Sequence, residues 1–558
     1  MAPRRSIFTA VVLTAALVAA ACGDDSSSQS VNDSGSGAST GATAASGATT
    51  TAVAPKYDPA AILKYGTMQA VSLDPVKQGS PCEVTQMRLI FDTLTRFDLD
   101  NKLQPMLAQS WTLDSPTVLT MKLRTGVKFQ DGTPFDAEAA KFNLDRVLSD
   151  PVSNTKALLA MVDNVAVVDA STIKITMKLA SGGPLLAALA DRSGMMISPT
   201  AYKALGAEAF NKAPVGSGMF KVEGAWRPVE ALNVRSWTGY WDTETPRVGG
   251  WDLTNLTVDS LVNALNSGSI ELATISATSQ IPGVEGQPNT TVIVGAPPVP
   301  QIRIFLLNPT VPPLDNLKVR QAIAYAIDRD AVASVMTDGR SKPTNQWFPK
   351  GVVGYDSSLD KLYPYDPAKA KALLAEAGFP NGFDLKANVG VTSTSYVQQG
   401  ELIQAMLKKV GINLDLNKIE VAQMVPSMYT GGPNGKGSIA SAPWATNLTP
   451  DLDTILRRGF LSGGSTNNGG DDAPGLKDIV DKAAAETDAA KREALMKEAN
   501  KIISEQVLEG VPLFPLPAIM AFKSYVGGIT KPQTGCPADL RGIYVTQGKV
   551  PAAENKSK

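Results

Sequence analysis

Residues 123–138 read LRTGVKFQDGTPFDAE, and this stretch decides how the surrounding chain folds. The residues that lead into it, 119–123, alternate between apolar and polar side chains, which predicts a half-buried strand. The run 131–134, Asp-Gly-Thr-Pro, is typical of a turn. Asp136 then stands where a helix N-cap belongs, before a helix predicted over 137–148. The stretch therefore predicts a strand, a tight turn and a capped helix.

The same combination of strands and helices continues along the chain. Residues 173–179 alternate in the same way and predict a second half-buried strand. An apolar stripe at helical spacing predicts a helix over 315–327, beginning at Asp315 or Asn316. The run 366–378 has an N-cap Asp, a Pro at the first helical position and a C-terminal Gly, and 476–508 predicts one long helix or a pair. The fold class is therefore α/β or α+β.

Composition excludes several classes of function. The chain has 558 residues, 43% hydrophobic and 19% charged, with a net charge of −1 and no histidine. A sizeable core is expected, and there is no general attraction to nucleic acid. Without histidine, the usual serine and cysteine catalytic groups cannot be assembled, and the commonest metal ligand is missing. A lysine- or carboxylate-based enzyme stays possible, but no catalytic constellation, metal site or cofactor site is predicted.

The N-terminus predicts export and a lipid anchor. Residues 1–21 have a basic start, a short apolar core and a small-residue end, as a secretory signal peptide does. Cys22 follows directly, in the position where a bacterial lipoprotein carries its lipid, and residues 22–56 predict a flexible tether. The alternative is ordinary signal cleavage at the same bond, which leaves Cys22 unmodified. The expected location is the extracytoplasmic face of the cell membrane.

The other two cysteines are Cys82 and Cys536. In an oxidising compartment two remaining thiols often pair, so a Cys82–Cys536 disulfide is a candidate link between the start and the end of the globular region. The alternative is two unrelated thiols.

Three motifs carry a resemblance to a known family. Residues 123–138 resemble the signature L-R-x-G-V-K-F-x-D-G-T-P-F-x-A-E of the family 5 extracellular solute-binding proteins, the peptide- and nickel-binding receptors of ABC importers. Residues 312–329, PPLDNLKVRQAIAYAIDR, are similar to a second motif of that family, followed by YDPAKAKALLAEAG at 365–378. Residues 213–218, APVGSG, resemble the family's P-V-G-T-G-P-Y turn more weakly. All of these are turn and helix-start sequences, so they identify the family without locating the ligand.

The resemblance implies a two-lobe fold of the periplasmic-binding-protein type, in which a hinge closes the lobes around a solute. Lobe I would comprise residues 57–304, with an inserted subdomain at about 99–210, and lobe II residues 305–515. Residues 516–558 would return to lobe I and form the C-terminal tail.

The resemblance also implies where the cleft lies. By position in the family pattern, the ligand-binding candidates are Pro81, Cys82, Trp444, Thr446, Asn447, Asn467, Asn468 and Phe514. Trp444 is the strongest candidate, since tryptophan offers flat contact and one N–H donor; the alternative is a core residue. For Asn467 and Asn468 the alternative is a plain glycine-rich loop.

One departure from the family bears on the ligand. In the peptide-binding branch a carboxylate follows the tryptophan by about three residues and pairs with the peptide's ammonium group. Here that place holds Thr446 or Asn447, which are neutral. A buried ammonium without a counter-charge is costly, so Asp451 or Asp453 would have to replace that carboxylate.

The expected function is that of a monomeric substrate-binding lipoprotein of an ABC importer. It captures a small solute, an oligopeptide or peptide-like compound, and presents it to the permease subunits. The alternatives are a sensing or interaction lipoprotein with the same fold, and a receptor for a non-peptide solute such as an oligosaccharide or a metal chelate. A tethered enzyme is the third class, and no motif favours it.

Overall fold

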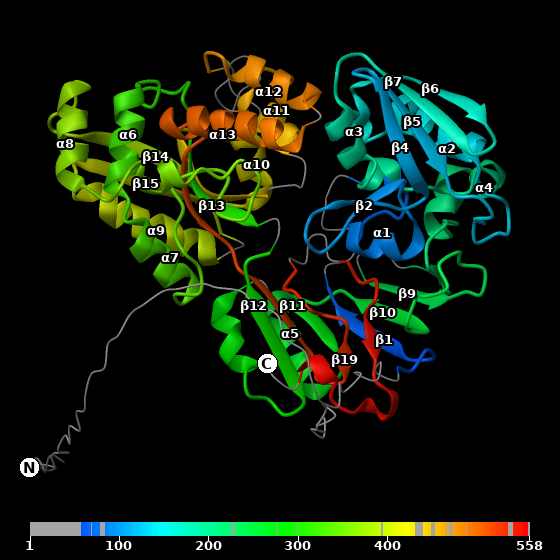
Figure 1. Ribbon diagram of the computed structural model, residues 1–558. Coiled ribbons are helices and arrows are strands. Elements are labelled where there is room, and N and C mark those ends of the chain that lie inside the picture. Colours follow the sequence, from blue (N-terminus) through cyan, green and yellow to red (C-terminus); the bar gives the residue numbers. More distant parts are fainter. Residues whose placement is uncertain are drawn as a thin grey trace, which may run out of the picture. The chain divides into compact units, whose positions relative to one another are not determined.

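The computed structural model describes most of the chain from residue 57 to residue 555 (Figure 1). The described residues are 57–67, 70–78, 84–224, 226, 228, 230–275, 277–297, 300–391, 394–429, 439–447, 452–464, 466–467, 473–486, 488–533 and 539–555. The chain divides into a unit of residues 1–54 and a compact unit of residues 55–558. All described residues belong to the second unit, so the predicted signal peptide, tether and lipidated cysteine lie outside them.

A seven-stranded mixed sheet organises the first lobe, in the order β12-β18-β11-β1-β10-β9-β8. Its strands are β1 (Ile62–Gly66), β8 (Phe220–Val222), β9 (Ala231–Ser236), β10 (Gly250–Thr254), β11 (Leu272–Ile275), β12 (Thr290–Gly295) and β18 (Ala518–Lys523). β18 pairs antiparallel with both β11 and β12, so the C-terminal part of the chain returns to this lobe. Tyr65 and Trp251 are fully buried in its core.

A second, separate sheet is formed by strands that lie between β1 and β8 in the sequence. β4 (Ala108–Ser115), β5 (Val118–Leu123), β6 (Val162–Asp169) and β7 (Thr172–Met177) form an antiparallel sheet in the order β4-β5-β7-β6. β5 and β7 confirm the two strands predicted from alternation. The predicted continuation of the second strand to Leu179 is wrong, because that side chain is 48% exposed and lies beyond β7. Its neighbour β6 begins only at Val162, opposite Met177, so residue 179 has no strand to pair with.

The opening stretch of the sequence folds as predicted and holds other motifs together. Asp136 caps α2 (Ala137–Ser149) by accepting a hydrogen bond from the amide of Ala139 at 2.9 Å. The buried side chain of Gln130 donates to the carbonyl oxygens of Ile90, Gly218 and Phe220 at 3.1, 3.2 and 2.8 Å. It also accepts from the amide of Gly216 at 3.1 Å. Hydrogen bonds of Gln130 therefore hold the 123–138 and 213–218 motifs together, so both motifs serve to stabilise the fold.

The second lobe is built on a five-stranded sheet in the order β15-β14-β16-β13-β17. Its strands are β13 (Gln301–Leu307), β14 (Phe383–Gly390), β15 (Ile412–Ile419), β16 (Ser441–Asn447) and β17 (Val511–Pro515). The central strand β13 pairs antiparallel with β16 and β17. Its side chains alternate between two hydrophobic clusters, with Ile304 and Leu306 on one face and Phe305 and Leu307 on the other.

The helices of this lobe follow their local signals. Asn316 caps α6 (Leu317–Ala326), and Asp366 caps α8 (Pro367–Glu376), which confirms both predicted helices. The predicted helix or pair over 476–508 is a pair, α12 (Leu476–Ala485) and α13 (Ala489–Glu505). The remaining helices of the lobe are α7 (Arg329–Thr337), η6 (Ser357–Lys361), α9 (Thr394–Lys408), α10 (Val421–Tyr429) and α11 (Leu452–Phe460).

The chain passes between the two large sheets twice, once between β12 and β13 and once between β17 and β18. The exact lobe boundaries stay a prediction. The other elements of the first lobe and the C-terminal segment are η1 (Pro75–Lys77), α1 (Val84–Ile90), β2 (Thr95–Phe97), β3 (Leu103–Pro105), η3 (Lys156–Leu159), α3 (Gly182–Ala188), η4 (Arg192–Gly194), α4 (Pro199–Lys212), α5 (Val258–Ser267), η5 (Thr278–Gly283), β19 (Val526–Gly527), β20 (Tyr544–Val545), η8 (Gln547–Lys549) and η9 (Ala553–Asn555). Within the described ranges, no helix combines the length and apolarity that crossing a bilayer requires.

Candidate functional site

The predicted site residues that the structure describes lie in the second lobe, around β13 and β16. The register of these antiparallel strands places Trp444 opposite Ile304 and Thr446 opposite Ile302. Asn447 is the last residue of β16. Pro81, Cys82 and Asn468 lie outside the described residues, as does the other half of the predicted disulfide, Cys536.

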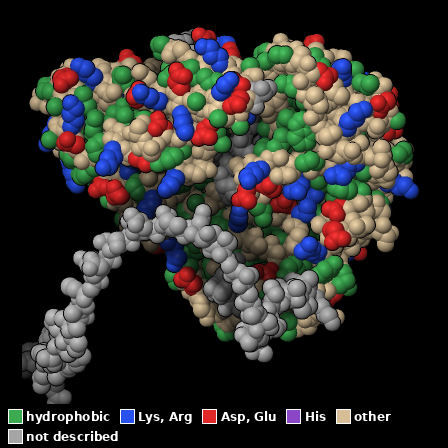
Figure 2. Space-filling model, in the orientation of Figure 1, with side chains coloured by type: hydrophobic (Ala, Val, Ile, Leu, Met, Phe, Trp, Pro, Cys, Tyr) green, Lys and Arg blue, Asp and Glu red, His purple; other side chains and the backbone are tan. Residues whose placement is uncertain are grey.

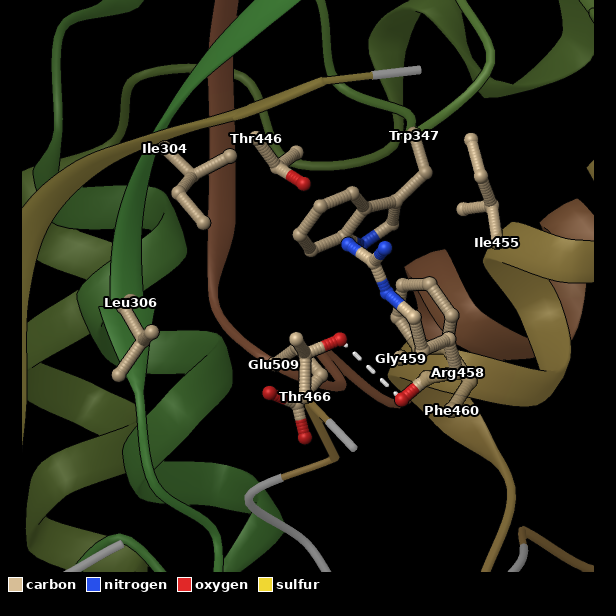
Figure 3. Close-up of a pocket in the computed structure, with 10 residues that line it drawn as sticks. All are labelled: Ile304, Leu306, Trp347, Thr446, Ile455, Arg458, Gly459, Phe460, Thr466 and Glu509. Carbon is tan, nitrogen blue, oxygen red and sulfur yellow. Dashed lines mark hydrogen bonds between the residues drawn. The ribbon is translucent and has the colours of Figure 1, made fainter. Parts of the chain in front are cut away.

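A small pocket opens next to Thr446 (Figure 3). Its lining residues are Ile304, Leu306, Trp347, Thr446, Ile455, Arg458, Gly459, Phe460, Thr466 and Glu509. Figure 3 shows the guanidinium of Arg458 beside the indole of Trp347, and the hydroxyl of Thr466 donates to the carbonyl of Arg458 at 3.1 Å. The pocket volume is about 40 Å³, enough for a few water molecules and far below the size of a peptide.

The pocket brings two predicted segments together. Thr446 comes from β16, while Thr466 immediately precedes the predicted Asn467, whose side chain is 9% exposed. The fold therefore places segments 444–447 and 466–467 on the same side of β13, although about twenty residues separate them in the sequence.

Phe514 occupies a different environment. It lies on β17 opposite Arg303 of β13, it is fully buried, and it belongs to the hydrophobic cluster on the other face of the sheet. It does not line the pocket. In this structure Phe514 is a core residue, next to Arg303 on the neighbouring strand.

Trp444 packs against one hydrophobic cluster of the lobe and also contacts a residue that was not predicted from sequence. Its ring stacks on Tyr396 of α9, with centroids 5.3 Å apart and an interplanar angle of 18°. Both side chains are partly exposed. The guanidinium carbon of Arg303 lies 4.5 Å from the centroid of the same tyrosine ring, within the range of a cation–π contact. Trp444, Tyr396 and Arg303 thus form one continuous cluster, drawn from β16, α9 and β13.

Arg303 is the unusual member of this cluster. Its side chain is 8% exposed, and burial lowers its pKa below the ordinary arginine value. The sequence does carry a signal for it, since a lone charged residue interrupts the apolar run 302–307. Tyr396 gives no such signal, because an aromatic residue in the first turn of a helix is unremarkable in sequence.

Glu509 is the described carboxylate that lines the pocket, while the two aspartates predicted to replace the missing carboxylate are engaged elsewhere or not described. Asp453 lies in the first turn of α11 and accepts a hydrogen bond from Arg457 at 2.8 Å. Arg457 also donates to Asp481 at 2.7 Å. Asp453 is therefore paired with an arginine of its own helix, and Asp451 lies outside the described residues.

The visible face of the molecule has no extended field of one charge. Figure 2 shows acidic and basic side chains interspersed over this face, in keeping with the net charge of −1. Among the described residues no group of three metal-ligating side chains comes together. The arrangement is suited to holding a solute by packing and hydrogen bonding.

Comparison with known proteins agrees with this arrangement. Residues 102–467 match the family of bacterial extracellular solute-binding proteins, family 5 middle. The glutathione-binding protein GsiB of Pectobacterium atrosepticum is 31% identical over 441 residues, covering 77% of this chain and 83% of that protein. GsiB of Escherichia coli (strain K12) is 29% identical over 485 residues, covering 83% and 91%.

A solved structure shows the same fold. The periplasmic binding protein DppA from Helicobacter pylori, in complex with the peptide STSA, has a TM-score of 0.75 and 24% sequence identity, covering 88% of this chain and 99% of that one. The resemblance deduced from the three sequence motifs is confirmed, and so is the two-lobe periplasmic-binding-protein fold. The chain belongs to the family 5 bacterial extracellular solute-binding proteins, which bind solutes rather than catalyse reactions.

Proposed function

We propose that this protein is the substrate-binding component of an ABC importer, and that it captures an oligopeptide or peptide-like compound and presents it to the membrane permease. The observation that carries the proposal is the family match over residues 102–467, which includes the Trp444 segment. The ligand class is supported by relatives named for glutathione and by a similar fold solved with the peptide STSA.

The proposed mechanism is capture by closure. The two connections between the large sheets, β12 to β13 and β17 to β18, would act as the hinge. Trp444 and Thr446, on a strand adjacent to β13, would form one wall of the cleft, together with Asn447, Asn467 and Asn468. Pro81 and Cys82 would contribute from the first lobe. Closure needs only that the solute binds the closed form better than the open form.

We further propose that the mature protein is a monomer anchored through a lipid on Cys22, outside the cytoplasmic membrane. The signal-like residues 1–21 and the small polar residues after Cys22 support this. A Cys82–Cys536 disulfide belongs to the same proposal. Mass spectrometry of the mature N-terminus tests the anchor, and non-reducing peptide mapping tests the disulfide. An unmodified Cys22 would contradict the anchor.

Thermal melting with a ligand panel tests the binding function. The panel should contain tripeptides, glutathione, neutral oligosaccharides and metal chelates. A bound solute at 100 times its Kd stabilises the folded protein by about 2.7 kcal/mol, which raises the Tm measurably. A peptide-class hit supports the proposal, whereas a hit limited to sugars or chelates identifies the non-peptide alternative. If no solute raises the Tm, the result favours the alternative that the protein is a sensing or interaction lipoprotein with the same fold.

A further inference from the structure

Arg303 is a buried cation without a balancing charge among the described residues. In the part of the chain that the structure describes, burial and Tyr396 act on its pKa, and no carboxylate does. One nitrogen, Nη2, donates to the hydroxyl of Ser395 at 2.9 Å. The other two, Nε and Nη1, are buried and have no hydrogen-bond partner among the described residues. Burying a charge in this way is costly unless something pairs with it.

The other two buried arginines of this lobe show what a structural arginine looks like here. Arg329 donates through Nε to the carbonyl of Pro512 at 2.9 Å, and through Nη1 to the carbonyls of Ala324 and Tyr363, both at 3.0 Å. Arg320 donates through Nε, Nη1 and Nη2, again to carbonyl oxygens. Neither has a buried nitrogen without a partner. Of the three arginines, Arg303 is the one with buried N–H donors that have no hydrogen-bond partner among the described residues.

The surroundings of Arg303 add positive potential. Ser395 is the second residue of α9, a helix of 15 residues, so the guanidinium lies at the N-terminal end of that helix. Helix N-termini carry a partial positive charge and favour anions, whereas cations are favoured at the opposite end. A guanidinium beside a helix N-terminus favours a negatively charged group over a positive one.

The stacked pair of Tyr396 and Trp444 lies beside the Arg303 guanidinium. Tyr396 contacts both the Arg303 guanidinium and the ring of Trp444, and both aromatic side chains are partly exposed. We propose that Arg303, with the first turn of α9, binds a carboxylate of the solute, while the Tyr396–Trp444 pair packs against the adjoining part of it. The proposal rests on the solute-binding function proposed above and names the chemistry of the solute.

A consequence concerns which end of a peptide is recognised. The place after Trp444 that would hold a carboxylate for an ammonium group is neutral, and Asp453 is held by Arg457. Among the described residues of the Arg303, Tyr396 and Trp444 cluster, the fixed charge is therefore positive. A peptide would bind here through its α-carboxylate, and a free α-amino group would not be required.

Binding of paired probes to the full mature protein tests this. The probes are a tripeptide library as free acids, the same library as C-terminal amides, the N-acetylated free acids, succinate and maltose, each measured by native mass spectrometry and thermal melting. Free acids and N-acetylated acids should bind alike. Loss of the charge-assisted hydrogen bonds should weaken the amides by about 30-fold or more.

The variants are R303M, R303K and the control K318M. Lys318 is a surface residue of the same lobe, paired with Glu376 at 3.1 Å, so K318M removes the same charge away from the site. R303M should lose the preference for acids over amides, R303K should keep part of it, and K318M should keep all of it. If R303M does not fold, R303K still tests the proposal, because a partial loss of the preference for acids is expected of it.

The outcomes separate this inference from the proposed function. Equal binding of acids and amides by the unmodified protein, or binding of maltose alone, overturns the carboxylate site and leaves solute binding standing. An R303M variant that folds and still prefers acids also overturns it. If no probe binds the unmodified protein, both proposals fall.

Discussion

Asp92 lies at a point where burial and ion pairing oppose each other, and the structure predicts which prevails. Its carboxylate is fully buried, accepts hydrogen bonds from Trp241 Nε1 at 2.7 Å and Tyr240 Oη at 3.2 Å, and lies 3.7 Å from Arg541 Nη2. Desolvation by burial raises the pKa of Asp92 to about 6, even though Arg541 and the two hydrogen bonds act in the opposite direction.

The sign of the pH effect follows from this shift. Because the folded protein holds the Asp92 proton more tightly than the unfolded chain, the stabilisation is fully present below the unfolded pKa of 3.8 and is lost as the pH rises through about 6. The whole effect is about 3 kcal/mol, since one pKa unit corresponds to about 1.36 kcal/mol. Roughly 2 kcal/mol of it falls between pH 4.5 and pH 7.5.

Urea unfolding of the unmodified protein and of D92N, at half-unit steps from pH 4.5 to pH 7.5, measures this contribution. Asparagine cannot ionise, so the difference between the two free energies of unfolding isolates Asp92, while the many other carboxylates cancel. Over this range the unmodified protein should lose about 2 kcal/mol relative to D92N. Any constant offset from altered hydrogen bonding does not affect the slope.

Two results would refute this reasoning. A difference that does not change with pH would mean that the pKa of Asp92 is the same in the folded and unfolded states. A difference that grows in favour of the unmodified protein as pH rises would mean that the pairing with Arg541 outweighs the desolvation.

Three further predictions concern the fold, the site and the N-terminus. Q130M should lower the free energy of unfolding by about 3 kcal/mol, because it removes four buried hydrogen bonds. The control Q287M, at an exposed position, should change the free energy of unfolding little. Equal urea midpoints for the two variants would count against the hydrogen bonding between the 123–138 and 213–218 motifs. W444A should raise the Kd for a bound solute about 10- to 100-fold by calorimetry with little change in Tm, and W444F should recover part of the affinity; unchanged affinity in W444A would remove Trp444 from the site. C22S should abolish acylation and release the protein from membranes on fractionation, and continued membrane retention would argue against the lipid anchor.

Local chemistry explains why so much of the fold could be predicted from sequence. The caps at Asp136, Asn316 and Asp366 act on amides two or three residues away, so the sequence alone locates the helix starts. The strand ending at Met177 shows the limit, since its length depends on where β6 begins rather than on its own alternation. Pairing between distant strands cannot be deduced from local pattern.

The site was harder to predict for the same reason. Trp444 and Thr446 were predicted through their place in the family pattern and stay predictions, but the cluster around Trp444 joins three elements far apart in the sequence. Tyr396 comes from the start of a helix and Arg303 from the middle of a sheet. Phe514 follows the same family pattern, yet it lies in the core, because its face of the sheet is covered by helices of the second lobe.

Native mass spectrometry of the freshly purified mature protein tests solute capture most directly. Since a closed cleft retains its solute, a fraction of the molecules should carry an added small mass that dissociates on unfolding and proves to be a peptide or peptide-like acid. A protein that carries no added mass, and that gains none from any member of the ligand panel, would contradict its assignment as a solute receptor.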